Sequence, residues 1–273
     1  MKTYTNCEGA VRLSPCTYGV SRLAFRGPRQ PTDGRFVAFL GGSDTFARYI
    51  STPFSDLVET EIDEVCINLG CQAAGPDVFL NDTAMQALRH GACGTVIQVL
   101  GAANLSNAYY RVHPRRNDRF IAPTTRLTDL YPEVDFSEIS FTGHLISKLR
   151  SVDEARFALV RTCLQATWVA RMRSLIDGAS AGPVFLLWFA SRFPQDAVES
   201  SQPVHEPVFV TAEMMNELRD YVTDIIEVVV QRGNTDQMSF AALDRLAAAD
   251  SFGWDAHQNA AKAVCEALVG RLS

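Results

Sequence analysis

Short apolar runs that each end at a glycine divide the first half of the chain. They cover residues 36–40, 64–69 and 94–100. Runs of this length and composition are typical of parallel strands buried on both faces. Between them, apolar residues recur at helical spacing over residues 45–61 and 81–90, and Pro53 is expected to kink or divide the first of these helices. The pattern therefore predicts three strands joined by helices.

The second half of the chain continues the alternation. Strands are predicted at residues 183–190 and 225–230, and helices at residues 151–176, 211–222, 239–249 and 258–272. This order predicts an α/β fold, a single doubly wound, flavodoxin-like three-layer sandwich with a five-stranded parallel sheet. Residues 1–34 are interpreted as an N-terminal lead-in and residues 35–273 as the domain. A polar and aromatic stretch at about 102–150 is predicted to be a long insertion after the third strand.

Composition is that of an ordinary globular protein and narrows the choice of partners. Of the 273 residues 47% are hydrophobic, and the net charge of −6 disfavours nucleic-acid binding as the main activity. No window approaches 18 uninterrupted apolar residues, and the first residues lack a signal-peptide pattern. Seven scattered cysteines without a C-x-x-C pair predict free thiols in a reducing, cytoplasmic compartment. The histidines show no ligand spacing, so neither a metal site nor a cofactor is expected, and the oligomeric state stays open.

Polar or small residues stand where the predicted strands end. Gly41-Gly42-Ser43 follows the first strand, Gly70 ends the second, and Asn104 lies just beyond the third. Since ligands of parallel α/β sheets bind at the carboxyl ends of the strands, we expect these residues at one edge. Each also has a plain structural interpretation: Ser43 as a helix N-cap, Gly70 as a strand terminator and Asn104 as a turn residue.

Ser43, Gly70, Asn104 and His257, in this order, resemble the four sequence blocks of the SGNH (GDSL-like) hydrolase superfamily. The resemblance implies a serine hydrolase or acyltransferase acting on an ester, with Ser43 as the nucleophile and His257 as the general base. It also implies that the amides of Ser43 and Gly70 and the side chain of Asn104 form the oxyanion hole. Asp255, two residues before the histidine, is the acid expected to orient the imidazole.

The sequence departs from the family pattern at two aspartates. Gly42 stands where the family has the aspartate before its serine, and Trp254 stands three residues before His257, where the orienting aspartate belongs. Asp255 and Asp250 are the nearby acids, although Asp255 also suits a helix N-cap and His257 a surface position. These departures keep a second function class open, a catalytically inactive module that binds an anionic glycan or another anion. Sulfuryl or phosphoryl transfer is a third hypothesis.

A cluster of basic and aromatic residues lies inside the predicted insertion. Its members are Tyr110, Arg111, His113, Arg115, Arg116 and Arg119. Arginine binds carboxylate, phosphate or sulfate groups in a bidentate manner, so the predicted substrate is an anionic small molecule or carbohydrate, such as an acetyl ester of an anionic sugar. The alternative is a set of structural ion pairs with Asp118, Glu133 and Asp135. The segment also resembles segments of bacterial proteins, a resemblance that carries no activity with it.

Overall fold

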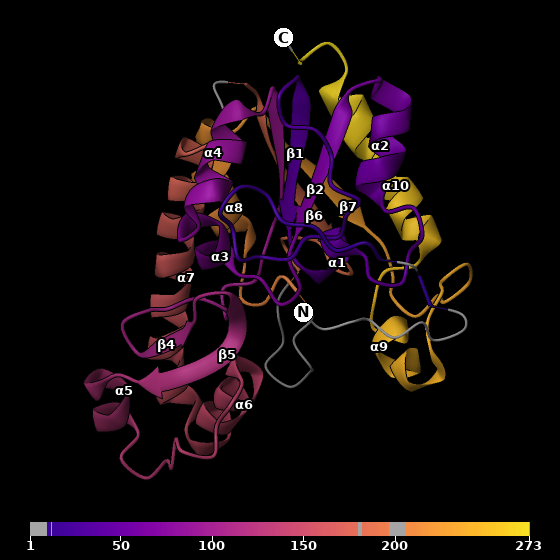
Figure 1. The fold of residues 1–273 in the computed structure, drawn as a ribbon. Coiled ribbons are helices and arrows are strands. Elements are labelled where there is room, and N and C mark those ends of the chain that lie inside the picture. Colours follow the sequence, from indigo (N-terminus) through magenta and orange to yellow (C-terminus); the bar gives the residue numbers. More distant parts are fainter. Residues whose placement is uncertain (1–9, 12, 180–181, 197–205, 273) are drawn as a thin grey trace.

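A five-stranded parallel sheet forms the centre of the protein in the computed structural model (Figure 1). The structure describes residues 10–11, 13–179, 182–196 and 206–272. The strands are β1 (Phe36–Gly41), β2 (Val65–Gly70), β3 (Gly94–Gln98), β6 (Val184–Ala190) and β7 (Asp224–Val229), in the spatial order β2-β1-β3-β6-β7. The register pairs Gly41 with Gly70, so β1 and β2 end side by side. The predicted α/β fold with a five-stranded parallel sheet between two helical layers is confirmed.

Two helical layers cover the sheet, and side chains alternate between them along β1. Val37 and Phe39 join the apolar cluster of the first layer, whereas Phe36, Ala38 and Leu40 join that of the second. The first layer holds α2 (Phe54–Ile62) and α10 (Trp254–Leu268), and the second holds α3 (Pro76–Leu80), α4 (Thr83–Gly91), α7 (Glu154–Asp177) and α8 (Ala212–Leu218) (Figure 1). All six residues of β1 are buried, which explains why its sequence is continuously apolar.

The helices differ from the predictions mainly at their ends. The helix expected over residues 45–61 is divided, as predicted from Pro53: α1 (Ser43–Phe46) ends before it, and Pro53 is the N-cap of α2. The closing helix begins at Trp254, so His257 lies in its first turn. The remaining short helices are η1 (Arg219–Tyr221), η2 (Ala242–Asp244) and α9 (Arg245–Ala249). In the described part of the chain, no helix has the length and apolar character needed to cross a membrane.

The stretch predicted as an insertion forms a small lobe below the carboxyl ends of the strands (Figure 1). It contains an antiparallel strand pair and two helices: β4 (Tyr110–His113), β5 (Arg116–Pro123), α5 (Thr125–Leu130) and α6 (Thr142–Val152). Buried side chains of the lobe, including Tyr110, Phe120 and Leu145, belong to the same apolar cluster as those of α7. The lobe is therefore packed onto the sandwich and shares its core.

One buried arginine fastens the N-terminal segment to the turn after β1. Arg26 is 4% exposed, and its guanidinium donates to the backbone carbonyls of Phe46, Ala47, Ile50 and Ser51. Carbonyls at the end of a short helix have no intrahelical partner, so the arginine satisfies groups that would otherwise be buried without one.

Candidate active site

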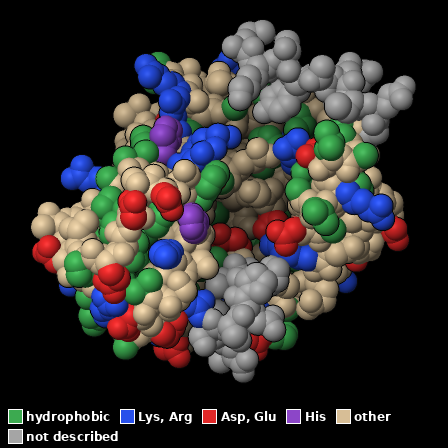
Figure 2. All heavy atoms as spheres, turned by 90° about the horizontal axis from the view of Figure 1, so that it is seen from below, with side chains coloured by type: hydrophobic (Ala, Val, Ile, Leu, Met, Phe, Trp, Pro, Cys, Tyr) green, Lys and Arg blue, Asp and Glu red, His purple; other side chains and the backbone are tan. Residues whose placement is uncertain are grey.

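The carboxyl ends of the strands open onto a hollow in the molecular surface. Figure 2 looks onto this edge and shows the hollow between two masses of the protein, with acidic and basic side chains gathered around it. The lobe of β4 and β5 and the region of α9 lie at opposite sides of this edge (Figure 1). Parallel α/β sheets bind ligands at this position.

Ser43 is presented at this edge by a turn that a side chain of β3 holds in place. It is the first residue of α1 and is exposed, while its neighbours Gly42 and Asp44 are buried. The Gln98 Oε1 atom accepts from the Gly42 amide at 2.9 Å and from the Thr45 hydroxyl at 2.7 Å. The buried amide of Gln98 thus fixes the backbone on both sides of Ser43. Gly42 is the N-cap of α1, so Ser43 does not hold the N-cap position that the alternative interpretation gives it.

The backbone amide that faces Ser43 belongs to Ala73. Its N–H donates to Ser43 Oγ at 3.2 Å, and its φ of 56° aims the loop after β2 toward the serine. The Gly70 amide, the predicted oxyanion donor, instead donates to Asn68 Oδ1 at 3.0 Å. A Cβ at Gly70 would lie 2.3 Å from the Phe46 amide nitrogen, so glycine is required there for the close approach of α1 to β2.

Asn104 is supported by the same loop that contacts Ser43. A Cβ at Gly75 would lie 1.7 Å from the Asn104 carbonyl oxygen, which shows how closely the two backbones pass. The Thr142 hydroxyl donates to Asn104 Oδ1 at 2.6 Å, so α6 orients the side-chain amide. The Nδ2 group of Asn104 donates to no other group in the described residues. The loop of residues 71–75 therefore contacts Ser43 through Ala73 and passes close to Asn104 at Gly75.

His257 and Asp255 do not join this constellation. His257 is 1% exposed, and its Nδ1 accepts from the Phe54 amide at 3.2 Å. Its ring stacks on Phe54 and packs edge-on against Phe189, at centroid distances of 5.8 and 5.6 Å. Asp255 is exposed, and residues two apart on a helix point in different directions. The predicted contacts of His257 with Asp255 and with Ser43 are therefore not formed in the structure.

The buried environment of His257 predicts a stability that depends on pH. Burial, together with the charge of Arg26, lowers the pKa of His257 from 6.5 to about 3. The folded protein keeps the ring neutral, whereas the unfolded chain protonates it below pH 6.5. The contribution of this group to the unfolding free energy is therefore fully favourable above pH 6.5 and declines as pH falls toward 3. Between pH 7 and pH 5 we expect the unfolding free energy to lose about 2 kcal/mol through this group.

Urea denaturation at the two pH values measures this loss. His257→Asn keeps an acceptor near Nδ1 without the titration, so its unfolding free energy should fall less than that of the wild type. His90→Asn, at an exposed position, is the matched control. An equal pH dependence of the wild type and His257→Asn would contradict the assignment.

A buried charge network lies directly behind Ser43, and the sequence interpretation missed it. Both Asp44 oxygens accept from Arg232, at 3.0 and 3.1 Å, and Arg232 also donates to the Asp250 carbonyl at 2.8 Å. Half-buried Glu206 lies nearby, accepts from the Val208 amide at 3.2 Å, and has its pKa raised by burial. Two features of the sequence could have indicated this network: Asp44 directly after Ser43, and Gln98 inside the apolar strand β3. Asp250 takes part through its backbone.

The basic and aromatic side chains of residues 110–119 do not form one continuous ligand-binding surface. Tyr110 is fully buried and donates its hydroxyl to the Ala103 carbonyl at 2.6 Å, so it supports the loop before Asn104 and does not face a ligand. Arg119 lies over the Phe141 ring at 4.2 Å. His113 is half-buried, and its Nδ1 accepts from the backbone amide of Arg115 at 3.2 Å.

The ion pairs considered as the alternative are not formed by this segment. Glu133 pairs with Arg156, and Asp135 accepts from the Ser137 amide. The exposed side chains of Arg111, Arg115 and Arg116 form no ion pair within the described parts of the chain. They remain available to an anionic ligand.

Fold and site together define a three-layer α/β protein with an exposed serine at the turn after its first strand. The model of the family described as "Domain of unknown function (DUF6473)" matches residues 1–272. The chain belongs to this family. No curated protein matches the chain.

Two solved structures are similar to it. One is a carbohydrate esterase family 2 enzyme plus carbohydrate binding domain from Corynascus thermopiles (Myceliophthora fergusii), with a TM-score of 0.44 and 10% identity, covering 90% of this chain and 69% of that chain. The other is an extracellular lipase from Streptomyces rimosus, with a TM-score of 0.46 and 13% identity, covering 87% and 100%.

Proposed function

We propose that the protein is an SGNH-like serine hydrolase or acyltransferase that acts on an ester, with Ser43 as its nucleophile. The observation that carries the proposal is the surrounding of Ser43: an exposed hydroxyl with the Ala73 amide aimed at it, and an Asn104 side-chain amide supported by the same loop. Acyl transfer needs a nucleophile and fixed donors for the charge that develops on the carbonyl oxygen. An acetyl ester of an anionic carbohydrate is the proposed substrate class.

The proposed reaction uses these groups in turn. Ser43 Oγ attacks the ester carbonyl carbon, and the carbonyl oxygen gains the negative charge. The amides of Ser43 and Ala73 and the side chain of Asn104 donate hydrogen bonds to that oxygen, with Ala73 taking the place first assigned to Gly70. The ester C–O bond then breaks and the alcohol leaves with a proton. Water or a second alcohol finally releases the acyl group from Ser43.

The proton of Ser43 needs an acceptor, a step that the SGNH resemblance assigns to His257. In the structure Nδ1 of this ring accepts from the Phe54 amide, so the neutral ring carries its proton on Nε2. Activity through His257 therefore requires the ring to leave Phe54 and approach Ser43. Asp255 is the proposed orienting acid in that arrangement.

Labelling with a fluorophosphonate probe tests the proposal. We expect the wild-type protein to be labelled and the modified peptide to contain Ser43, and Ser43→Ala to lose the label completely. Ser51→Ala, at an exposed serine on the same connection, should label like the wild type. A folded wild-type protein that neither takes up the probe nor hydrolyses a short-chain aryl ester would refute the hydrolase.

A second candidate is a module that binds an anionic glycan without turnover. The burial of His257 against Phe54 favours it, because among the described residues no histidine or carboxylate side chain hydrogen-bonds to Ser43 Oγ. The unpaired arginines of the lobe supply the anion-binding groups. Calorimetry with anionic sugars separates the two functions, since binding by this module should survive Ser43→Ala.

A further inference from the structure

A cavity lined by none of the Ser43 site residues lies between the N-terminal segment, the α3–α4 connection and the β4–β5 turn. Its volume is about 410 Å³, which is in the range of small-molecule sites. The polar residues that line it are Arg22, Asn81, Asp82, Thr83 and Arg115. Apolar side chains complete the wall, so the cavity combines an apolar surface with a few polar groups.

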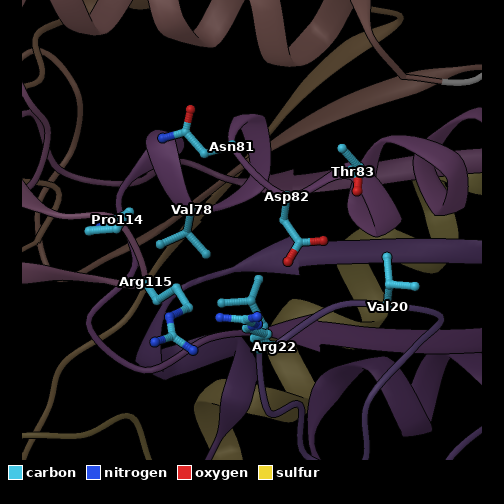
Figure 3. A pocket seen from close by; sticks show the side chains of 9 residues that line it. Val20, Arg22, Val78, Asn81, Asp82, Thr83, Pro114 and Arg115 are labelled. Carbon is cyan, nitrogen blue, oxygen red and sulfur yellow. The ribbon is translucent and has the colours of Figure 1, made fainter.

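Two arginines from distant parts of the sequence converge on this cavity. Figure 3 shows the side chains of Arg22 and Arg115 reaching into the same space, with the Asp82 carboxylate facing it. Neither arginine forms an ion pair with an acid of the described residues. Two like charges repel each other when they converge, and a bound anion would relieve this repulsion.

Hydrogen bonds hold the backbone beside each arginine at the edge of the cavity. The Ser21 hydroxyl donates to Asp82 Oδ2 at 2.8 Å and accepts from the Leu23 amide at 3.1 Å, which fixes the chain around Arg22. On the opposite side, the Arg115 amide donates to His113 Nδ1 at 3.2 Å. A backbone that is already ordered loses less entropy when a ligand binds.

The remaining polar groups suit hydroxyls. Asp82 caps α4 through Oδ1, which accepts from the Ala84 and Met85 amides, and this role holds its carboxylate in the cavity wall. A carboxylate at this place repels an anion but accepts from a hydroxyl group. Asn81 and Thr83, on either side of Asp82 in the chain, also line the cavity and carry an amide and a hydroxyl.

We infer that this cavity binds a polyhydroxylated molecule that carries an oxyanion, such as a sugar acid or a sugar phosphate. Arg22 and Arg115 bind the anionic group, and Asn81, Asp82 and Thr83 bind hydroxyls. The inference gives the anion-binding candidate a defined site and rests on that candidate alone. It is independent of chemistry at Ser43.

Calorimetric titration of the full chain with glucuronate, glucose 6-phosphate and neutral glucose tests this site. We expect at least one of the anionic sugars to bind and neutral glucose to bind at least about tenfold more weakly, since a charged hydrogen-bonded contact contributes enough for such a factor. Arg22→Gln and Arg115→Gln should each weaken the anionic sugar about tenfold or more. Comparison of the two anionic sugars distinguishes a carboxylate from a phosphate ligand.

Arg245→Gln is the matched control, because Arg245 is exposed on α9, outside the lobe, and does not line the cavity. Its affinity should stay within about twofold of the wild type, and Ser43→Ala should bind normally. Absence of binding would overturn both the cavity and the anion-binding candidate. Binding that is unchanged in Arg22→Gln and Arg115→Gln, or that falls equally in Arg245→Gln, would overturn the cavity alone. Failed fluorophosphonate labelling with intact binding would refute only the hydrolase.

Discussion

Arg232→Met is expected to lower the unfolding free energy by about 3–5 kcal/mol, because it leaves the Asp44 carboxylate buried without its counter-ion. The side chains of the pair are only 13% and 9% exposed. Arg232 also lies over the Phe252 ring at 3.9 Å and donates to the Asp250 carbonyl, so the variant loses several contacts at once. Urea denaturation at pH 7 measures the change.

The exposed pair of Arg48 and Asp244 is the control for this experiment. Its side chains are 43% and 30% exposed, and Arg48→Met should cost no more than about 1 kcal/mol. The double variant Asp44→Asn/Arg232→Met should regain part of the loss, because the uncompensated charge is gone. A loss below about 1 kcal/mol for Arg232→Met would show that the network does not stabilise the turn.

Asn104→Ala is expected to reduce kcat for a short-chain aryl ester by about 10²–10³-fold with little change in KM, if Ser43 is the nucleophile. Removing one oxyanion-hole donor typically has this effect, since the lost hydrogen bond forms mainly in the transition state. Thr142→Val removes the hydroxyl that holds Asn104 Oδ1, so it should cause a smaller fall in kcat, about tenfold.

Initial rates of the wild type and the variants test the role of Asn104. Asn259→Ala, at an exposed position on α10, should leave the rate unchanged. An Asn104→Ala variant that is labelled by the fluorophosphonate and keeps the wild-type kcat would remove Asn104 from the proposed oxyanion hole. The amides of Ser43 and Ala73 would then be the donors left to test.

The strands of this protein were predictable because each one is marked by its own short run of apolar residues. The run Phe36 to Leu40 is apolar at every position, since the sheet is covered on both faces, and glycine ends β1 and β2 where the chain must turn closely. Helix ends were less predictable. α1 stops after four residues because Ala47 adopts a left-handed conformation, which no local pattern of apolar residues indicates.

The site was predictable only in part. The sequence predicts Ser43 and Asn104 as site residues because a hydroxyl and an amide stand out after apolar strands. The sequence predicts the Gly70 amide as an oxyanion donor, whereas in the structure this amide donates to Asn68 and the amide that approaches Ser43 is that of Ala73. A backbone N–H is present at almost every position, so its direction depends on loop conformation and leaves no signal in the residue type.

The sequence by itself determined the class of fold, the positions of the strands along the chain and the placement of Ser43 after the first strand. These features depend on hydrophobic periodicity and on glycine. Tertiary structure decided which groups meet there. His257 accepts a hydrogen bond from the Phe54 amide, and Asp44 pairs with Arg232, 188 positions away in the chain. Arg22 and Arg115 line the same cavity. Such contacts between distant residues follow from how the layers pack, and no local pattern along the chain encodes them.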